Sequence, residues 1–431
     1  MSIGERLRRN PVIDTLVTLR GNPRACLYTE PLWGIPYNLY LPYASVYMAA
    51  LGLSPTQIGL NSTLFFAAQM VWALLSGVLT DKLGRRTATL IFDIVSWSIP
   101  SLLWMFAQDF TWFVVAALFN GAWRVTETSW GLLLIEDAPD DKLIHLYSLN
   151  HIAGLLAGFV APVAYFFVQR YTVIPTMRFL YGLTFVMMTT KFILLFFLCR
   201  ETSVGLRRMA ETRHMSVFTH LWGGREVLGR MLRDRRVMLT VGFMACFTGM
   251  RNINDAFWPL LVTEKLGIAA ENLSVFSTLR TLLMLLCYFV IVPKLDLRGF
   301  HKPLTLALCL FLVQEAAMLL MPAAAYGFVL LTVVLEAVGL SILYPLSHSL
   351  QMVNIEREER ARMLAFFYAM CMLVTSPLTT LAGVLADVNR KLPFVLNLLL
   401  TAGAVGFGAA LWKIGLRTEE AEDTIEIAEI E

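Results

Sequence analysis

The chain has 431 residues, of which 57% are hydrophobic and only 16% are charged, and its net charge is +3. Soluble domains carry about 25% charged residues, so this composition excludes a soluble globular protein and indicates an integral membrane protein. The small net charge argues against nucleic acid as a partner. Six cysteines and six histidines are scattered without paired or ligand spacing, so neither a disulfide framework nor a metal site is expected.

The chain begins with a polar segment and continues as a series of apolar runs. Residues 1–30 carry five arginines around apolar positions, which predicts a cytoplasmic segment with an amphipathic helix on the membrane surface. Runs of about 20 residues, each enough to cross a core of about 30 Å, follow it. Twelve such runs lie near 31–50, 57–79, 87–107, 111–135, 143–169, 176–199, 237–262, 272–293, 303–321, 325–352, 363–386 and 392–412.

The distribution of Lys and Arg tests this count, because cytoplasmic loops are enriched in both residues. With both termini inside, the cytoplasmic segments hold 26 of the 35 Lys and Arg, whereas the external segments hold five. An error in the number of spans would mix the two classes of loop. The charges therefore favour twelve spans with both ends in the cytoplasm.

A short basic loop joins the second and third runs and contains Gly77, Asp81, Gly84, Arg85 and Arg86. It resembles the signature loop between helices 2 and 3 of the major facilitator superfamily, in which these residue types recur at this spacing. We expect the first glycine to allow close helix approach, the second to permit the turn, and the aspartate to meet a helix N-terminus. An ordinary positive-inside loop is the alternative.

An internal repeat appears at an offset of 215 residues, where 51–64 align without gaps on 266–279 and Asp296 falls on Asp81. The expected fold is an all-α membrane protein with twelve transmembrane helices in two six-helix pseudo-symmetric bundles. Its predicted parts are a cytoplasmic N-terminal segment (1–30), a first bundle (31–199), a cytoplasmic linker (200–236), a second bundle (237–415) and an acidic disordered tail (416–431).

Charged residues inside the apolar runs are costly, so each needs a partner or a cavity. The resemblance implies that helices 1, 4, 7 and 10 line a central cavity flanked by helices 2, 5, 8 and 11. By this criterion the predicted substrate-binding charges are Arg124, Glu127, Arg251, Asp255, Arg280 and Glu336. Structural pairing or gating is expected of Asp93, Lys191 and Glu315. Because the first two Arg–acid pairs are spaced three and four residues apart, neutralisation within each helix is the alternative.

Aromatic and polar residues on the same runs add binding candidates, namely Tyr37, Asn38, Tyr40, Trp123 and Trp258. An aromatic stripe on a membrane helix is also typical of packing, and that alternative stays open. Glu136 and Asp137 follow the fourth run, where related transporters place an acid that pairs with the arginine of the signature loop. We therefore predict a gate made of these two acids, the five loop residues and Asp296.

The sequence contains no Gly-Lys dipeptide and thus no phosphate-binding loop, which argues against an ATP-driven pump. No constellation of acids and histidines indicates an enzyme, and no cofactor is expected beyond H⁺ as a coupling ion. The resemblance implies a secondary active transporter that works by alternating access. The Arg–acid pairs inside the apolar runs predict a small polar or anionic organic solute and coupling to protons. The alternatives are a multidrug or amphipathic-lipid exporter and, more remotely, a non-transporting sensor.

The exporter alternative is weakened because Ala117 stands where drug/proton antiporters carry an arginine ahead of Asn120-Gly121. The expected setting is a bacterial-type cytoplasmic membrane, with a monomer that crosses the lipid bilayer many times and keeps both termini in the cytoplasm. The expected partner is a small-molecule substrate.

Overall fold

The computed structural model describes residues 16–138, 143–214, 225–291, 301–322, 325–353 and 360–430, and its regular structure over these ranges is helical. The chain divides into two compact units. Unit 1 comprises Met1–Gly223 and Ala269–Thr281, and unit 2 comprises Gly224–Ile268 and Leu282–Glu431. The division after Gly223 lies inside the predicted linker, and a short segment of the eighth apolar run groups with unit 1.

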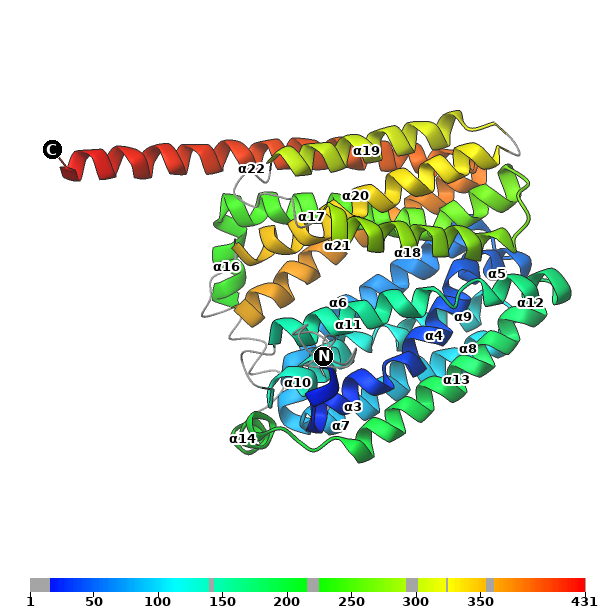
Figure 1. The fold of residues 1–431 in the computed structure, drawn as a ribbon, viewed down its shortest axis with the longest axis horizontal. Coiled ribbons are helices and arrows are strands. Elements are labelled where there is room, and N and C mark those ends of the chain that lie inside the picture. The colour runs from blue at the N-terminus through cyan, green and yellow to red at the C-terminus, as the bar shows by residue number, and fades with distance from the viewer. Residues whose placement is uncertain are drawn as a thin grey trace, which may run out of the picture. The chain divides into compact units, whose positions relative to one another are not determined.

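Unit 1 contains the first six apolar runs as helices, several of them in two pieces (Figure 1). Its elements are α3 (Gly21–Thr29), α4 (Pro31–Tyr40), η1 (Leu41–Tyr43), α5 (Ala44–Ala50), α6 (Pro55–Leu83), α7 (Arg85–Asp93), η2 (Ile94–Ser98), α8 (Ile99–Phe106), α9 (Phe110–Asn120), α10 (Trp123–Ile135), α11 (Leu143–Gly158), α12 (Val163–Tyr171), α13 (Val173–Leu198) and α14 (Ser203–Thr212).

Identifiable residues cause the breaks within these runs. Pro42 lies in the 3₁₀ turn η1, where its missing N–H interrupts the helical hydrogen bonds between α4 and α5. The fourth run breaks between α9 and α10 at Gly121, where an added Cβ would lie 2.5 Å from Cβ of Ala68 on α6. The glycine therefore lets the broken fourth run approach α6 closely.

Unit 2 contains α16 (Arg225–Arg233), α17 (Arg235–Leu260), the π-helical turn η4 (Leu261–Lys265), α19 (His301–Leu320), α20 (Tyr326–Val353), α21 (Arg360–Val388) and α22 (Leu392–Ile430). Helix α18 (Asn272–Val290) begins in unit 1 and ends in unit 2. Helix α22 continues to Ile430, through the tail that the sequence predicted to be disordered (Figure 1). Glu, Ile and Ala are prominent in that tail. Glu and Ala are good helix formers, which explains the difference.

Eight of the described helical runs are long and apolar enough to cross a membrane. They are Pro55–Leu83, Arg85–Phe106, Leu149–Tyr171, Val173–Leu198, His301–Leu320, Tyr326–Ser347, Phe366–Val388 and Leu392–Lys413. The other four predicted runs are the first, fourth, seventh and eighth. The first and fourth are broken, the seventh carries Arg251 and Asp255, and the eighth is a shorter apolar helix over Asn272–Tyr288.

Helix α3 corrects the prediction for part of the N-terminal segment. It packs against α10 and α13, and Cys26 and Leu27 are buried in a cluster with Leu134 and Leu195. Asn22 anchors it, because its amide donates to the Arg200 carbonyl and its carbonyl accepts from the Arg200 N–H, both at 2.9 Å. Residues 21–29 therefore belong to the core of unit 1, whereas the helix predicted before residue 16 lies outside the described residues.

Candidate functional site

Two glycines of the signature loop have different surroundings. Gly84 joins α6 to α7 with φ +81° and ψ 159°, a backbone conformation that is essentially restricted to glycine. A Cβ at Gly84 would also lie 2.6 Å from Glu201 Oε2 and 2.7 Å from Met209 Sδ. At Gly77 an added Cβ meets nothing within 4 Å. The close helix approach predicted at Gly77 is not seen among the described residues, and the role of Gly77 in the gate stays a prediction.

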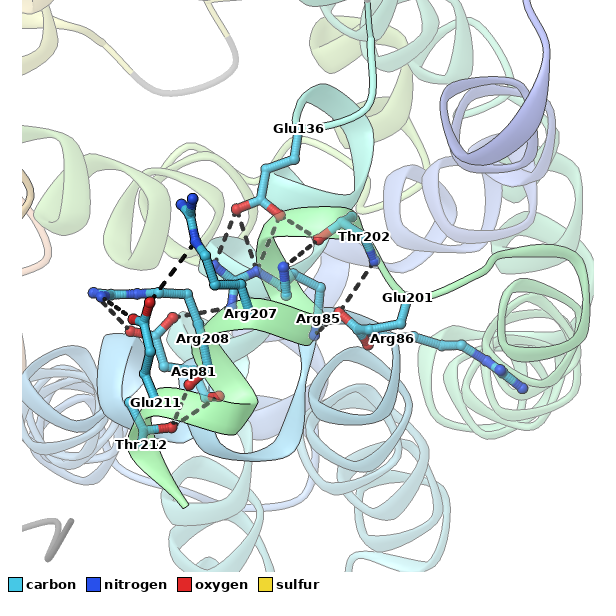
Figure 2. A network of polar contacts seen from close by, with 11 residues as sticks. Asp81, Arg85, Arg86, Glu136, Glu201, Thr202, Arg207, Arg208, Glu211 and Thr212 are labelled. Carbon is cyan, nitrogen blue, oxygen red and sulfur yellow. Dashed lines mark hydrogen bonds and ion pairs between the residues drawn. The ribbon is translucent and has the colours of Figure 1, made fainter. Parts of the chain in front are cut away.

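Arg85 lies at the centre of the loop network shown in Figure 2. Its buried guanidinium donates from Nη1 to Asp81 Oδ1 at 2.9 Å. The Nε and Nη2 atoms donate to Glu136 Oε2 and Oε1 at 3.1 and 3.0 Å. This fork-to-carboxylate pairing is a strong, charge-assisted arrangement. The expected contact between the acid after the fourth run and an arginine of the loop is therefore present, and its role as a gate stays a prediction.

Glu201 occupies the N-terminus of α7. Its Oε1 accepts from the Arg85 N–H at 2.8 Å, and its Oε2 accepts from the Arg86 N–H at 3.0 Å. A carboxylate at this position is favoured by the positive end of the helix. The contact expected of Asp81 is of this type, but Asp81 instead pairs with Arg85 and lies 3.4 Å from Arg208 Nη2. Asp81 lies in the last turn of α6, whose negative end favours cationic partners.

Helix α14 lies across the loop and adds polar contacts to it (Figure 2). Its N-cap, Thr202, accepts from the Gly205 N–H at 2.9 Å and donates to Glu136. Thr212 at the other end donates to the Asp81 carbonyl at 3.3 Å. Gly205 permits this packing, because a Cβ there would lie 2.1 Å from Glu201 Oε1. The segment that follows α13 therefore packs against the signature loop and forms hydrogen bonds with it within unit 1.

The remaining gate residues lie at the edge of this network or outside the description. Arg86 points away from Arg85, donates to the Phe196 carbonyl at 2.7 Å and lies over the Phe196 ring at 4.0 Å (Figure 2). Asp137 is exposed and accepts from the Ser203 N–H at 3.4 Å. Asp296 lies outside the described residues. Sequence reasoning missed Glu201, Thr202 and Arg208. These polar residues follow the sixth run directly, and this position was the signal that could have linked them to the loop.

The charge cluster of unit 1 is built around Arg124 on α10. Its Nη1 lies 2.5 Å from Glu127 Oε2, and its Nε donates to Gln69 Oε1 on α6 at 2.9 Å. The guanidinium also lies over the Trp123 ring, 4.6 Å from the centroid. Gln69 is buried, whereas the Glu127 side chain is 49% exposed. A polar residue inside the second apolar run was the signal that could have revealed Gln69.

The charge cluster of unit 2 has one cation and two carboxylates. Arg251 Nη2 donates to both oxygens of Asp255 at 3.0 Å, and its Nη1 donates to Glu336 Oε1 at 2.8 Å. Asn254 Nδ2 donates to the same Glu336 oxygen at 2.9 Å. The Glu336 side chain is 3% exposed, whereas that of Asp255 is 49% exposed. Three residues of α17 and one of α20 thus form a network that is open at Asp255.

The self-pairing alternative describes the contacts of Arg124 and Arg251 in this structure. Both arginines nevertheless pair with a half-exposed acid, so an added ligand can exchange with that acid without opening the bundle. Arg280 on α18 is partly buried and engaged in polar or charged interactions, and Trp258 is also in contact with a neighbour.

Lys191 has a structural partner that sequence reasoning missed. Its Nζ lies 2.7 Å from Glu30 Oε2 and approaches the rings of Trp33 and Trp130 at 5.9 and 5.4 Å from their centroids. Glu30 lies just before the first apolar run, and it was therefore counted with the N-terminal segment. The pairing expected of Lys191 is present, and the buried Asp93 on α7 interacts electrostatically with Lys191 and contacts Thr126.

The aromatic candidates lie mainly against other rings of unit 1. Tyr37 stacks on Trp33 at 4.7 Å between centroids, and Tyr40 is buried against Trp104 and Tyr181. Asn38 donates to the Gly34 carbonyl of its own helix at 2.8 Å. Packing, the alternative that the sequence left open, therefore describes Tyr40. Tyr37 and Asn38 are partly exposed and remain candidates.

Comparisons with known proteins agree with this architecture. A family model described as Major Facilitator Superfamily matches residues 34–252. The nucleoside transporter NupG, as a point variant, has a similar structure with a TM-score of 0.69 at 14% identity, covering 91% of this chain and 99% of that chain. A point variant of the peptide transporter POT has a TM-score of 0.69 at 13% identity, covering 91% and 94%.

A POT family transporter in complex with 5-aminolevulinic acid also has a TM-score of 0.69 at 13% identity, covering 92% of this chain and 96% of that chain. Among curated protein sequences, none matches this chain. The structural likenesses show a shared fold, and the family model covers just over half of the chain. The protein is therefore a multi-pass membrane protein that belongs to the major facilitator superfamily, a transporter of that type.

Proposed function

We propose that this protein is a secondary active transporter that moves a small polar or anionic organic solute by alternating access, coupled to protons. The observation that carries the proposal is the pair of arginine clusters, one in each unit, in which a guanidinium meets a half-exposed carboxylate. Arginine offers a fixed fork of donors that suits a carboxylate or phosphate. An anionic group of a solute can take the place of Glu127 or Asp255 at that fork.

The surplus of acid in unit 2 supports proton coupling. Arg251 carries one positive charge, whereas Asp255 and Glu336 together bring two carboxylates to it. A net negative charge is costly inside a membrane protein, and a proton on one carboxylate removes it. Protonation of Asp255 would also weaken its hold on Arg251 Nη2, which then becomes available to a solute.

The neighbouring structures favour the same class of substrate. They are a nucleoside transporter, a peptide transporter and a POT family transporter in complex with 5-aminolevulinic acid, and these solutes are small and polar. We extend that class of solute to this chain. We further propose that the protein is a monomer in a bacterial-type cytoplasmic membrane. Both termini and the arginine-rich α14 and α16 lie on the cytoplasmic side in this proposal.

An exporter of drugs or amphipathic lipids is the second candidate. The cluster of Trp33, Tyr37, Trp97 and Trp123 favours it, because these rings lie together and two of them are stacked. A non-transporting sensor of the same fold is the remote alternative. A thermal-shift screen of the purified protein against sugars, organic acids, nucleosides, peptides and cationic drugs separates the first two, and uptake of the hit into proteoliposomes excludes the third. Stabilisation by cationic drugs alone would contradict the proposal.

The gate is tested by Asp81→Asn. The substitution keeps the side-chain shape and removes the negative charge that meets Arg85 and Arg208, where charge-assisted bonds contribute about 1.5–3 kcal/mol. We expect initial uptake to fall several-fold while substrate affinity in a binding assay stays near the wild-type value. Glu211→Gln, which removes an exposed acid beside the same Arg208, serves as the matched control. Wild-type uptake by the Asp81→Asn protein would show that this contact does not gate transport.

The binding role of Arg124 is tested by a graded series. Arg124→Lys keeps the charge without the fork and should weaken substrate binding moderately, whereas Arg124→Ala should nearly abolish it. Because Glu127 is half-exposed, losing its partner should have little effect on folding, and Arg124→Ala should therefore yield folded protein. Isothermal titration with the identified solute gives the affinities, and thermal unfolding gives the stability. Unchanged affinity in well-folded Arg124→Ala protein would restrict Arg124 to a structural role.

A further inference from the structure

A second buried acid in unit 2 has no cationic partner. Glu315 on α19 is 1% exposed. Its Oε1 accepts a hydrogen bond from Asn397 Nδ2 on α22 at 3.4 Å, and its Oε2 is buried without a partner. Among the described residues, no Lys or Arg forms an ion pair with it. Glu336 differs in this respect, because it meets Arg251.

The helices that pack against α19 do not supply the missing charge. Helix α20 packs against α19, and the charged residue that it brings nearest to Glu315 is Glu336, which is itself an acid. Tyr344 of α20 packs edge-on against Phe247 of α17. Directly before α22, the cation Lys391 donates to the carbonyl oxygens of residues 319 and 321 at 2.8 Å, beyond the turn that holds Glu315. An ionised Glu315 would therefore be an uncompensated buried charge, which is strongly unfavourable.

Asn397 carries the complementary defect. It is fully buried, and its Oδ1 has no hydrogen-bond partner. The two unpartnered oxygens thus belong to two side chains that are already in contact. An ionised carboxylate has no hydrogen to donate, but a protonated one carries an O–H, and an amide oxygen is an acceptor. With a proton on Oε2, Glu315 can donate to Asn397 Oδ1 while the Asn397 amide donates to Glu315 Oε1.

The pair is connected to the arginine cluster of the same unit through α22. Thr401, one turn after Asn397, donates to the Asn397 carbonyl at 2.9 Å and lies 3.2 Å from Met250 Sδ. Met250 directly precedes Arg251 on α17. A change in the position of α22 on protonation of Glu315 is therefore transmitted to the helix that holds Arg251, Asn254 and Asp255.

Resting on the proposed proton-coupled transport, we propose that Glu315, paired with Asn397, is the proton-binding site through which unit 2 is coupled to the proton gradient. The acid holds its proton in the structure described here. Glu315 is separate from the acids at Arg251. A proton on Asp255 releases the arginine for the solute, whereas the proton on Glu315 is the one that the gradient drives. Deprotonation leaves an unpaired charge and so requires a state of unit 2 in which water or a cation reaches the site.

Glu315→Gln tests this assignment, because glutamine has the shape of the protonated acid but cannot release a proton. We expect the purified variant to unfold at or above the wild-type temperature. In proteoliposomes it should retain exchange of labelled for unlabelled solute, whereas accumulation driven by an inward proton gradient should be lost. Glu264→Gln is the matched control, since Glu264 is a more exposed acid of unit 2 paired with Arg390. It should behave as the wild type does.

A spectroscopic measurement on the same proteins supplies an independent readout. At neutral pH, the infrared carbonyl band of a protonated carboxylic acid should be present in the wild type and in Glu264→Gln and reduced in Glu315→Gln. Gradient-driven accumulation by Glu315→Gln, an unchanged infrared band, or accumulation driven by Na⁺ in place of H⁺ would each overturn the assignment. Absence of any solute uptake by the wild-type protein would instead refute the proposed function.

Discussion

Arg251→Ala should lower the stability of the protein more than Arg124→Ala. Arg251 neutralises Glu336, whose side chain is 3% exposed, and removal of one partner of a buried ion pair costs about 3–5 kcal/mol. The variant should give little folded protein and a lower temperature of thermal unfolding in detergent. Arg124→Ala leaves the half-exposed Glu127 and the neutral Gln69, so its stability should remain closer to that of the wild type.

Two double variants locate the origin of this loss. Arg251→Ala with Glu336→Gln should recover much of the folded yield, because the acid left unpaired is then neutral. Arg251→Ala with Asp255→Asn should recover less, because Asp255 is half-exposed and water can solvate its charge. If Arg251 binds the solute, the rescued protein should still lack substrate binding. Wild-type affinity in the rescued protein would show that the cluster is structural.

Gly84→Ala should disrupt the signature loop, and Gly77→Ala on the preceding helix α6 provides a matched control. Backbone strain of the kind expected for alanine at φ +81° and ψ 159° costs about 1–3 kcal/mol, and the new Cβ would displace Glu201 from the N-terminus of α7. Uptake and thermal stability should both fall. Gly77→Ala should be neutral or stabilising by up to about 1 kcal/mol, because it lies inside a helix beside open space.

The comparison between the two glycine variants is read from thermal unfolding and from initial uptake rates. Equal behaviour of Gly84→Ala and Gly77→Ala would contradict the tight packing of Glu201 against the loop. If Gly84→Ala lowers the unfolding temperature, the double variant Gly84→Ala/Glu201→Ala should recover part of that stability. The recovered part reports the steric clash with Glu201, and the remaining loss reports the backbone strain.

The sequence predicted the apolar helices and the charged contacts that are local along the chain. Arg124 with Glu127 and Arg251 with Asp255 lie one turn apart, so their pairing follows from helical periodicity alone. The pairing of Arg85 with Glu136 required a resemblance to a family, because 51 residues separate them. The breaks in the first and fourth runs coincide with Pro42 and Gly121, two residue types that disfavour a helix interior.

Contacts that depend on which face of a helix points inward could not be predicted. In a membrane bundle the lipid-facing and core-facing sides are both apolar, so hydropathy does not distinguish them. For this reason the sequence did not predict that Tyr40 is buried in the core or that Gly77 lies beside open space. Glu201 and α14 were missed for another reason, since a polar segment after a membrane span has no periodicity that fixes where it packs. The Glu315–Asn397 pair was not predicted either, because the two residues are 82 positions apart in the chain.

Uptake into proteoliposomes shows whether transport by this protein is driven by a proton gradient. The solute identified by thermal shift is presented with an inward proton gradient, and initial rates and final levels are compared with those after the gradient is collapsed by a protonophore. A proton-coupled secondary transporter should accumulate the solute above the external concentration with the gradient and only equilibrate it without the gradient. Final levels that are the same with and without the gradient, or uptake driven by hydrolysis of ATP, would contradict a proton-coupled secondary transporter.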